Sequence, residues 1–465
     1  MGTFYQEKGV IVGVIDTGID IFDNAFRNSD GTTRILNIYD QTTGEKYDKQ
    51  SIDEYIRLNE DLSGGTFSYD NAPGVDNIMH GTDVSYIAAG SLGVAYEADI
   101  IAVKMGYSIN NQFPRTTSLM DAIDYIIRKA IEYRKPVAVN ISYGCNYGAH
   151  NGNTLLESFI DDISKSYRCV ICVGSGNEAD KAIHFGGIIN TGQVQTAYLS
   201  VGEYQSAIDI QIWKNYWDTI DVMLINPRGE QIGIITEGRI NRYETYNTEI
   251  ITLLGEPSPY NIYQEIYINL IPKTDYILSG IWQIVLMAGS IRAGEYNIWL
   301  PSSQALGYAT AFNNPTADGT ITIPATARNC IAVGAYNAYT NSYAAFSGRG
   351  FDNSIRNVNA GVKPDITAPG VDISIARQRG NDITYRNVTG TSYAVPVVTG
   401  AAALLMQWGI VMGNDRFMYG EKLKAALIDG SKPVGLVGIT RNDNQPDPRT
   451  GWGAVCLKNT LNKIL

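Results

Sequence analysis

The first third of the chain alternates short apolar runs with longer stretches of helical spacing. Nearly every position in the apolar runs is hydrophobic, which is typical of strands buried on both faces; these runs are residues 9–15, 100–104, 136–141 and 168–173. Residues 117–133 and 155–166 instead repeat their apolar positions every three or four residues, as amphipathic helices do. Strand and helix in alternation predict a parallel sheet with helices on both faces.

The pattern changes from residue 191 to 300. Short runs rich in Ile, Tyr and Trp are separated there by turn sequences such as Asn226-Pro227-Arg228-Gly229, and no long helical pattern appears. These features predict an all-β region of sandwich or jelly-roll type. Four of the 6 tryptophans fall in it: Trp213, Trp217, Trp282 and Trp299. Such aromatic residues can pack two sheets together or form a groove for a sugar or peptide, and packing is the favoured interpretation.

The α/β pattern then returns. A strand is predicted at 330–336 and helices at 392–412 and 422–429. The all-β region is therefore predicted to be an insertion in one α/β domain. We expect the parts to be 1–189 and 308–465 for the α/β domain, and 190–307 for the insertion.

Composition narrows the function classes. Of the 465 residues 44% are hydrophobic and 18% charged, as in globular proteins. A net charge of -11 without a basic stripe argues against nucleic acid as a partner. The 5 cysteines are too few and too scattered for a disulfide framework, and Cys169 and Cys172 are expected to be core thiols. The apolar stretch 395–412 is interrupted by polar residues and Gly, so a buried core helix is expected there and not a membrane span.

Three side chains that are far apart in the sequence form a candidate catalytic set. Asp16 ends the first strand, where parallel sheets place functional groups, although alone it would more often be a turn residue. The Asp-Thr-Gly motif of aspartic proteases has to occur twice, and here it occurs once. His80 opens a predicted helix with small residues, whereas His150 and His184 are expected to be loop residues. Ser392 lies in a small-residue turn before a buried helix, which exposes a nucleophilic hydroxyl. The order Asp, His, Ser is one of those found in Ser-His-Asp triads.

A negative charge that develops during acyl transfer needs hydrogen-bond donors fixed in advance. Asn177 ends the fourth strand, and its side-chain amide can donate one hydrogen bond. The backbone N–H of Ser392, at a helix N-terminus, can donate another. The preceding residues Gly174, Ser175 and Gly176 lack the full dinucleotide-binding fingerprint, so a nucleotide cofactor is not predicted.

Together these motifs resemble the subtilisin-like serine proteases (the subtilases, peptidase S8). The matching segments are Val14-Ile15-Asp16-Thr17-Gly18-Ile19-Asp20, His80-Gly81-Thr82, Asn140-Ile141-Ser142-Tyr143-Gly144, Gly174-Ser175-Gly176-Asn177-Glu178 and Gly390-Thr391-Ser392-Tyr393-Ala394-Val395-Pro396. The resemblance implies a subtilisin-like fold and a serine endopeptidase in which Asp16, His80 and Ser392 form the triad. It implies that Asn177 and Ser392 form the oxyanion hole. It also implies a protein or peptide substrate bound along Ser142, Tyr143 and Gly144, with Gly174, Ser175 and Gly176 on the wall of the first specificity pocket.

The all-β insertion is similar to that of the clostridial Csp-type subtilases, known for activating a cortex-degrading enzyme during spore germination. This similarity implies a bacterial spore, cell-envelope or extracellular location, which the sequence itself does not indicate. Two departures from the family stand out. A second His usually follows the catalytic one by three residues, and Asp83 occupies that position here. Only about fifteen residues precede Asp16, so we expect a mature or trimmed product, for which a cleaved prodomain is a candidate partner.

Two other functions remain open at this stage. The chain could be a catalytically inactive subtilase that acts as a binding or sensing scaffold, or a carbohydrate-binding or adhesive protein based on the insertion. No cofactor or metal is expected. The acidic segment 443–447 could meet a calcium ion, but it lacks a recognised ligand spacing, so a solvated loop is favoured and structural calcium is unsupported.

Overall fold

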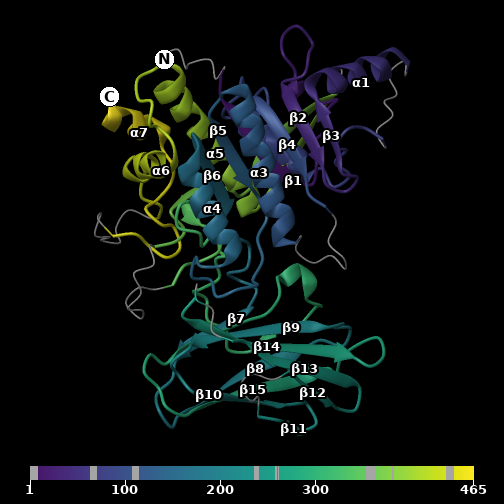
Figure 1. Ribbon diagram of the computed structural model, residues 1–465, viewed down its shortest axis with the longest axis vertical. Helices are drawn as coiled ribbons and strands as arrows, with labels where there is room; N and C mark the ends of the chain where they lie inside the picture. The colour runs from purple at the N-terminus through teal and green to yellow at the C-terminus, as the bar shows by residue number, and fades with distance from the viewer. Residues whose placement is uncertain are drawn as a thin grey trace.

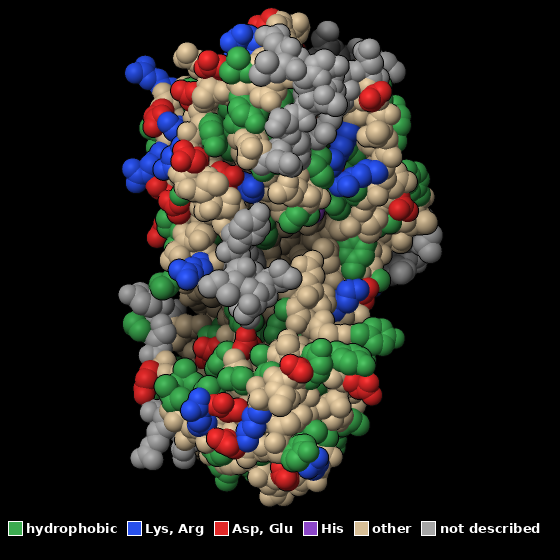
Figure 2. All heavy atoms as spheres, turned by 90° about the vertical axis from the view of Figure 1, so that its right-hand side faces the viewer, with side chains coloured by type: hydrophobic (Ala, Val, Ile, Leu, Met, Phe, Trp, Pro, Cys, Tyr) green, Lys and Arg blue, Asp and Glu red, His purple; other side chains and the backbone are tan. Residues whose placement is uncertain are grey.

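The protein has an α/β part and an all-β part stacked along its long axis (Figure 1). A computed structural model describes residues 9–62, 71–106, 115–234, 240–256, 259, 261–351, 362–379, 382–435 and 445–465. On the face shown in Figure 2, basic and acidic side chains are interspersed over both parts.

The α/β part is built on a 9-stranded sheet with the order β19-β18-β6-β5-β1-β4-β2-β3, in which β20 also pairs with β18. All its pairs are parallel except β2 with β3 and β18 with β19. This arrangement confirms the predicted parallel sheet. The strands are β1 (Ile11–Asp16), β2 (Ile35–Asp40), β3 (Glu45–Asp48), β4 (Asp99–Lys104), β5 (Val137–Ile141), β6 (Cys169–Gly174), β18 (Ile331–Asn337), β19 (Ser342–Tyr343) and β20 (Ile366–Pro369).

Helices cover both faces because the central strands are apolar on both. Along β1, Val12 and Val14 join a core on one side of the sheet, while Ile11 and Ile15 join another core on the opposite side. In Figure 1, α3 and α4 lie on the near face and α5 on the far face. The helices are α1 (Lys49–Leu62), α2 (His80–Ala89), α3 (Thr116–Tyr133), α4 (Leu155–Ser166), α5 (Thr391–Met406), α6 (Gly420–Asp429) and α7 (Leu457–Ile464). Shorter helical segments are η1 (Asn24–Phe26), η3 (Ser303–Ala305) and the π-helical η4 (Gln407–Val411).

Local sequence accounts for where some helices begin. The Oγ1 of Thr154 accepts a hydrogen bond from Glu157 N at 3.2 Å, and the Glu157 carboxylate accepts one from Thr154 N at 2.9 Å. This reciprocal cap fixes the start of α4. Among the described residues, one helical stretch, Thr391–Val411, is long and apolar enough to cross a membrane. Most of it is buried inside the protein, as expected for a core helix.

The all-β part consists of two antiparallel sheets with the orders β11-β10-β15-β8-β17 and β12-β13-β14-β9-β16-β7. Buried and less buried residues alternate along β14, so one face of that strand packs into a core shared by the two sheets. The strands are β7 (His184–Ile188), β8 (Val194–Val201), β9 (Ile208–Asn215), β10 (Ile220–Ile225), β11 (Gln231–Ile232), β12 (Ile240–Glu244), β13 (Thr248–Leu254), β14 (Tyr263–Pro272), β15 (Gly280–Ala288), β16 (Glu295–Trp299) and β17 (Ala311–Phe312). The predicted all-β insertion between β6 and β18 is therefore present.

The edges of the insertion extend past the predicted interval. Strands β7 and β17 lie outside 190–307 and still pair with strands of these sheets. Trp282 and Trp299 are each 1% exposed and Trp213 packs on the same core, so these three residues pack the sheets, whereas Trp217 is 53% exposed.

One histidine assignment was wrong. His184 was expected in a loop, but it lies in β7 and is buried, with its ring stacked on Trp299 at a centroid distance of 4.9 Å. His150 does lie in a loop, and its ring also stacks on Trp299. The residues next to His184 in the sequence could not reveal this packing, because Trp299 lies far along the chain.

Candidate active site

Asp76 fixes the start of α2, the helix that carries His80 on its first turn. This buried carboxylate accepts hydrogen bonds from Met79 N at 2.7 Å and from Thr82 N at 2.8 Å. It therefore satisfies backbone donors that a helix start leaves free. Sequence reasoning missed Asp76, although an acidic residue just before a predicted helix start was the available signal.

Glycines let α2 approach the end of β1 closely. A Cβ atom at Gly81 would lie 2.3 Å from the carbonyl oxygen of Gly18 and 2.9 Å from the Cβ of Asp16. The Gly81 N–H donates to Thr17 Oγ1 at 2.9 Å, and that hydroxyl donates to Asp76 at 2.8 Å. The turn after β1 and the start of α2 are thus joined at a distance that no larger residue permits.

This approach brings His80 to Asp16. The His80 Nδ1 lies 2.7 Å from Asp16 Oδ1, and the same oxygen accepts a hydrogen bond from Thr17 N at 2.7 Å. Burial alone disfavours the imidazolium, but the nearby carboxylates of Asp16 and Asp76 outweigh it and raise the pKa of His80 above its ordinary value. Because Nδ1 faces the carboxylate, it carries the proton in the neutral ring and leaves Nε2 as the basic nitrogen.

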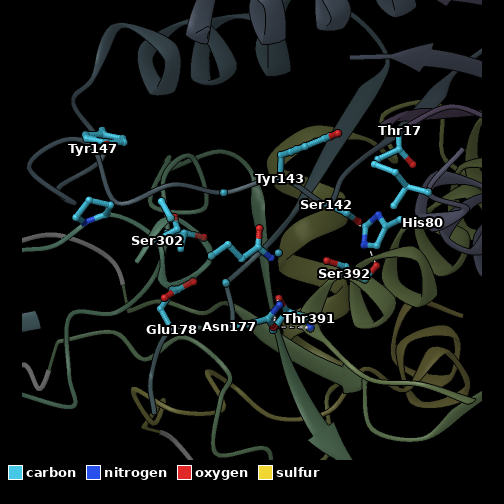
Figure 3. Close-up of a pocket in the computed structure, with 18 residues that line it drawn as sticks. Thr17, His80, Ser142, Tyr143, Tyr147, Asn177, Glu178, Ser302, Thr391 and Ser392 are labelled. Carbon is cyan, nitrogen blue, oxygen red and sulfur yellow. Dashed lines mark hydrogen bonds between the residues drawn. The ribbon is translucent and has the colours of Figure 1, made fainter. Parts of the chain in front are cut away.

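Ser392 stands on the first turn of α5, in the same pocket as His80. The pocket has a volume of about 380 Å³, and both residues line it. Figure 3 shows the Ser392 side chain beside the His80 ring. The ring of the next residue, Tyr393, has its centroid 5.5 Å from the centroid of the His80 ring. His80 and Ser392 therefore line one pocket, and Asp16 contacts His80 without lining it. The triad assignment stays a prediction.

Asn177 is oriented by the residue that precedes Ser392. Its Oδ1 accepts hydrogen bonds from Thr391 N at 2.9 Å and from Thr391 Oγ1 at 3.0 Å. A backbone N–H can bond only to the oxygen of an amide side chain, so this contact fixes which end of Asn177 is the carbonyl. The Nδ2 group is left as a donor in the pocket that Ser392 lines. Thr391 is a second residue that sequence reasoning missed.

The predicted substrate-binding residues differ in their surroundings. Ser142, Tyr143, Gly144, Gly174 and Gly176 line the pocket. The Ser142 hydroxyl donates to the backbone oxygen of Ser392 at 3.1 Å. The Ser175 side chain is buried, 3.3 Å from the Ser347 hydroxyl, and is not among the residues that line the pocket.

Thr322 lies beneath two of these glycines. A Cβ atom at Gly144 would lie 2.2 Å from its hydroxyl, and one at Gly176 would lie 2.4 Å from its methyl group. Thr322 belongs to the part of the chain after the insertion and lines the same pocket. No local signal in the sequence indicated it, because its role depends on contacts across the fold.

Asp83, which occupies the position of the family's second His, forms an ion cluster. Its carboxylate is fully buried and pairs with Arg377 and Arg386 on the hairpin of β21 (Ile373–Arg379) and β22 (Asp382–Val388). Arg377 also donates from Nη2 to the carbonyl oxygen of Met79 at 2.9 Å. The cluster ties the helix that carries His80 to the hairpin that leads into Ser392.

The acidic segment 443–447 and the cysteine pair Cys169 and Cys172 were also considered in the sequence. The described part of the chain holds no group of three or more His, Cys, Asp or Glu side chains arranged to bind a metal. In the segment considered for calcium, residues 443 and 444 lie outside the described residues, and the Asp447 carboxylate is bonded to Arg449. Cys169 and Cys172 are free and buried, as predicted.

Known proteins share the sequence pattern and the fold of this chain. A sequence profile of the Subtilase family (peptidase S8) matches residues 7–258 and 293–453. The structure of the Clostridium perfringens CspB protease superposes with a TM-score of 0.88 at 33% sequence identity, and covers 99% of this chain and 94% of that one.

Curated relatives match over shorter stretches. The subtilase-type proteinase RRT12 of Saccharomyces cerevisiae is 33% identical over 128 residues, which is 27% of this chain and 23% of that protein. Subtilisin E of Bacillus subtilis is 38% identical over 107 residues, 23% of this chain and 24% of its own length. These alignments therefore span about a quarter of each relative.

Proposed function

The chain belongs to the subtilase family, and from this membership we propose that it is a serine endopeptidase that hydrolyses peptide bonds. The observation that carries the proposal is the 2.7 Å contact between His80 Nδ1 and Asp16 Oδ1 beside a pocket that Ser392 also lines. The similarity to the CspB protease along almost the whole chain supports a role in processing a specific protein substrate.

The proposed mechanism assigns a role to each of these residues. His80 Nε2 removes the proton from Ser392, whose Oγ attacks the peptide carbonyl carbon, while Asp16 holds the ring and stabilises the imidazolium. The carbonyl oxygen becomes an oxyanion that accepts hydrogen bonds from Asn177 Nδ2 and the Ser392 N–H. His80 then protonates the leaving amine, an acyl-enzyme remains, and water activated by His80 hydrolyses it.

Labelling by a fluorophosphonate probe tests the proposal. The unmodified protein should react covalently at Ser392, and Ser392→Ala should not react. A proteome-derived peptide library should then give cleavage products with the first protein and none with the second. A protein that neither reacts with the probe nor cleaves any peptide would favour an inactive subtilase that acts as a scaffold.

A further inference from the structure

Three aromatic rings meet where the chain enters and leaves the insertion. His184 begins β7, Trp299 ends β16, and His150 lies in the loop that follows β5 of the α/β part. The Trp299 ring is stacked on both histidines, with centroid distances of 4.1 Å to His150 and 4.9 Å to His184. All three side chains are buried. In Figure 1, β7 lies where the all-β part meets the α/β part, so this cluster belongs to the junction of the two.

Both ring nitrogens of His150 face oxygen atoms that can only accept hydrogen bonds. Nδ1 lies 2.6 Å from the carbonyl oxygen of Ile321, and Nε2 lies 3.1 Å from that of Asn146. A neutral imidazole has one N–H and one lone pair, so it can donate to only one of these oxygens. Its other nitrogen would then direct a lone pair at a buried carbonyl oxygen, which is repulsive. An imidazolium ring donates to both.

His184 does not need a second proton in the same way. Its Nε2 lies 2.9 Å from Asn297 Oδ1, whereas its Nδ1 lies 3.3 Å from the carbonyl oxygen of Thr316, which is long for a hydrogen bond. One proton on Nε2 therefore serves the shorter contact. A second cation beside the same indole ring would also be repelled by the first. The positive charge of the cluster is accordingly assigned to His150.

The surroundings of His150 offset the cost of burying a charge. A cation is attracted to the face of an indole ring, and more strongly when water is excluded. Residues 143–153, which form most of its loop, contain no Asp, Glu, Lys or Arg. The charged side chains around the junction are mainly acidic: Asp209 bonded to Tyr147, Glu265 bonded to Gln211, Glu295 bonded to Asn297, Glu157 bonded to Thr154, Asp318 in the segment 316–322, and the basic Arg328 bonded to Asn153.

The same ring helps to hold the floor of the pocket. Ile321, which faces Nδ1, directly precedes Thr322, the residue beneath two of the pocket glycines. Two backbone hydrogen bonds already join the loop to this segment: Cys145 N donates to Ile323 O at 2.9 Å, and Ile323 N donates to Cys145 O at 2.8 Å. His150 adds a third link between the loop and the segment, and its stacked ring attaches both to the insertion.

We propose that His150 is a positively charged positioning residue that joins three segments: its own loop, the segment that carries Thr322, and the insertion at Trp299. Through this ring the insertion helps to hold the pocket floor in place. The inference goes beyond the proposed function, because neither the charge nor the stacking depends on peptide hydrolysis.

NMR of the unmodified protein tests the charge. The chain has 3 histidines, so selective ¹³C labelling of their Cε1 atoms gives three signals, which His80→Phe, His150→Phe and His184→Phe assign. The urea-unfolded protein supplies the reference shifts of the charged and neutral rings. At pH 7, where a free imidazole with its ordinary value of about 6.5 is mostly neutral, the His150 signal should have the shift of an imidazolium. A neutral His150 ring at pH 7 would overturn the inference.

His150→Phe tests the positioning role, because it keeps an aromatic ring beside Trp299 and removes both N–H donors. Amide hydrogen exchange at Cys145, Thr322 and Ile323 should become at least about tenfold faster. Urea unfolding should show a loss of stability that is largest below about pH 6.5 and shrinks as pH rises, because the imidazolium of the unmodified protein then loses its proton. His80 titrates in both proteins, so its contribution cancels in the comparison.

The matched control is His184→Phe, which makes the same change in the other ring stacked on Trp299. The hydrogen-bond partners of His184 are Thr316 and Asn297, so exchange at Cys145 should stay as in the unmodified protein. Equal exchange at Cys145 in the two variants, or a stability loss in His150→Phe that is the same at every pH, would overturn the inference. If His150→Phe does not fold, the NMR result on the unmodified protein decides. Failure of Ser392 to react with the fluorophosphonate probe would instead overturn the proposed catalysis and leave this inference standing.

Discussion

Removing the Asp83 carboxylate should destabilise the protein strongly, because it leaves buried positive charge without its partner. Asp83 is fully buried, and Arg377, whose side chain is 15% exposed, donates from Nε to its Oδ1 at 2.9 Å. Breaking a buried pair from one side costs about 3–5 kcal/mol. Arg386 is 43% exposed and can turn towards water, and Arg377 keeps its bond to Met79. We therefore expect Asp83→Ala to cost about 3 kcal/mol, at the lower end of that range.

Urea unfolding followed by far-UV circular dichroism measures this cost. The control is Asp124→Ala, which breaks an exposed pair with Arg128 on α3 and should cost only about 0.3–0.5 kcal/mol. If the penalty comes from stranded charge, Arg377→Ala should cost less in the Asp83→Ala protein than in the unmodified one. A loss no larger than that of Asp124→Ala, or additive effects of Asp83→Ala and Arg377→Ala, would refute the reasoning.

Four further outcomes are expected. Asn177→Ala should lower kcat by roughly 10²–10³ with little change in KM, because the lost donor acts on the oxyanion, and steady-state kinetics with a cleaved peptide measures this. Activity should fall in acid, with half of it lost at a pH above 6.5, because the pKa of the proposed base His80 is raised. A pH–rate profile with its midpoint below pH 6.5 would contradict this. Stability should depend on pH in the opposite direction from activity. Protonated His80 stabilises the folded protein fully below its unfolded pKa of about 6.5, and this stabilisation is lost as pH rises through the folded pKa. Denaturation at several pH values measures this loss. Gly81→Ala should cost about 1–3 kcal/mol and slow probe labelling, because its Cβ would meet the Gly18 carbonyl oxygen; an unchanged melting temperature would show that the turn yields freely.

The sequence predicted the elements whose signals are local. Residues 155–166 were expected to be helical and form α4 with the same bounds, because the apolar spacing lies within the segment and the reciprocal cap starts at the residue just before it. His80 was expected to open a helix and is the first residue of α2. The apolar strands could be predicted equally well, because strands buried on both faces of a sheet contain few polar residues.

Residues that act across the fold could not be predicted in this way. Arg377 lies 294 positions from Asp83, and Thr391 lies 214 positions from Asn177, so no periodicity or spacing connects them. Ser303 and Glu178 meet only because the insertion folds back on the catalytic part. These contacts depend on the relative placement of whole elements, which a single sequence does not specify locally.

The placement of the insertion also affects how the protein is made. Asp16, His80 and Asn177 all precede it along the chain, and Ser392 follows it. A ribosome adding about 5–20 residues per second needs roughly 10–40 s to pass from Asn177 to Ser392. During that interval the nascent polypeptide has the proposed base and one proposed oxyanion donor, but it lacks the proposed nucleophile. Under the proposed mechanism, synthesis itself therefore delays any hydrolysis of neighbouring chains until both β-sheets of the insertion have been translated.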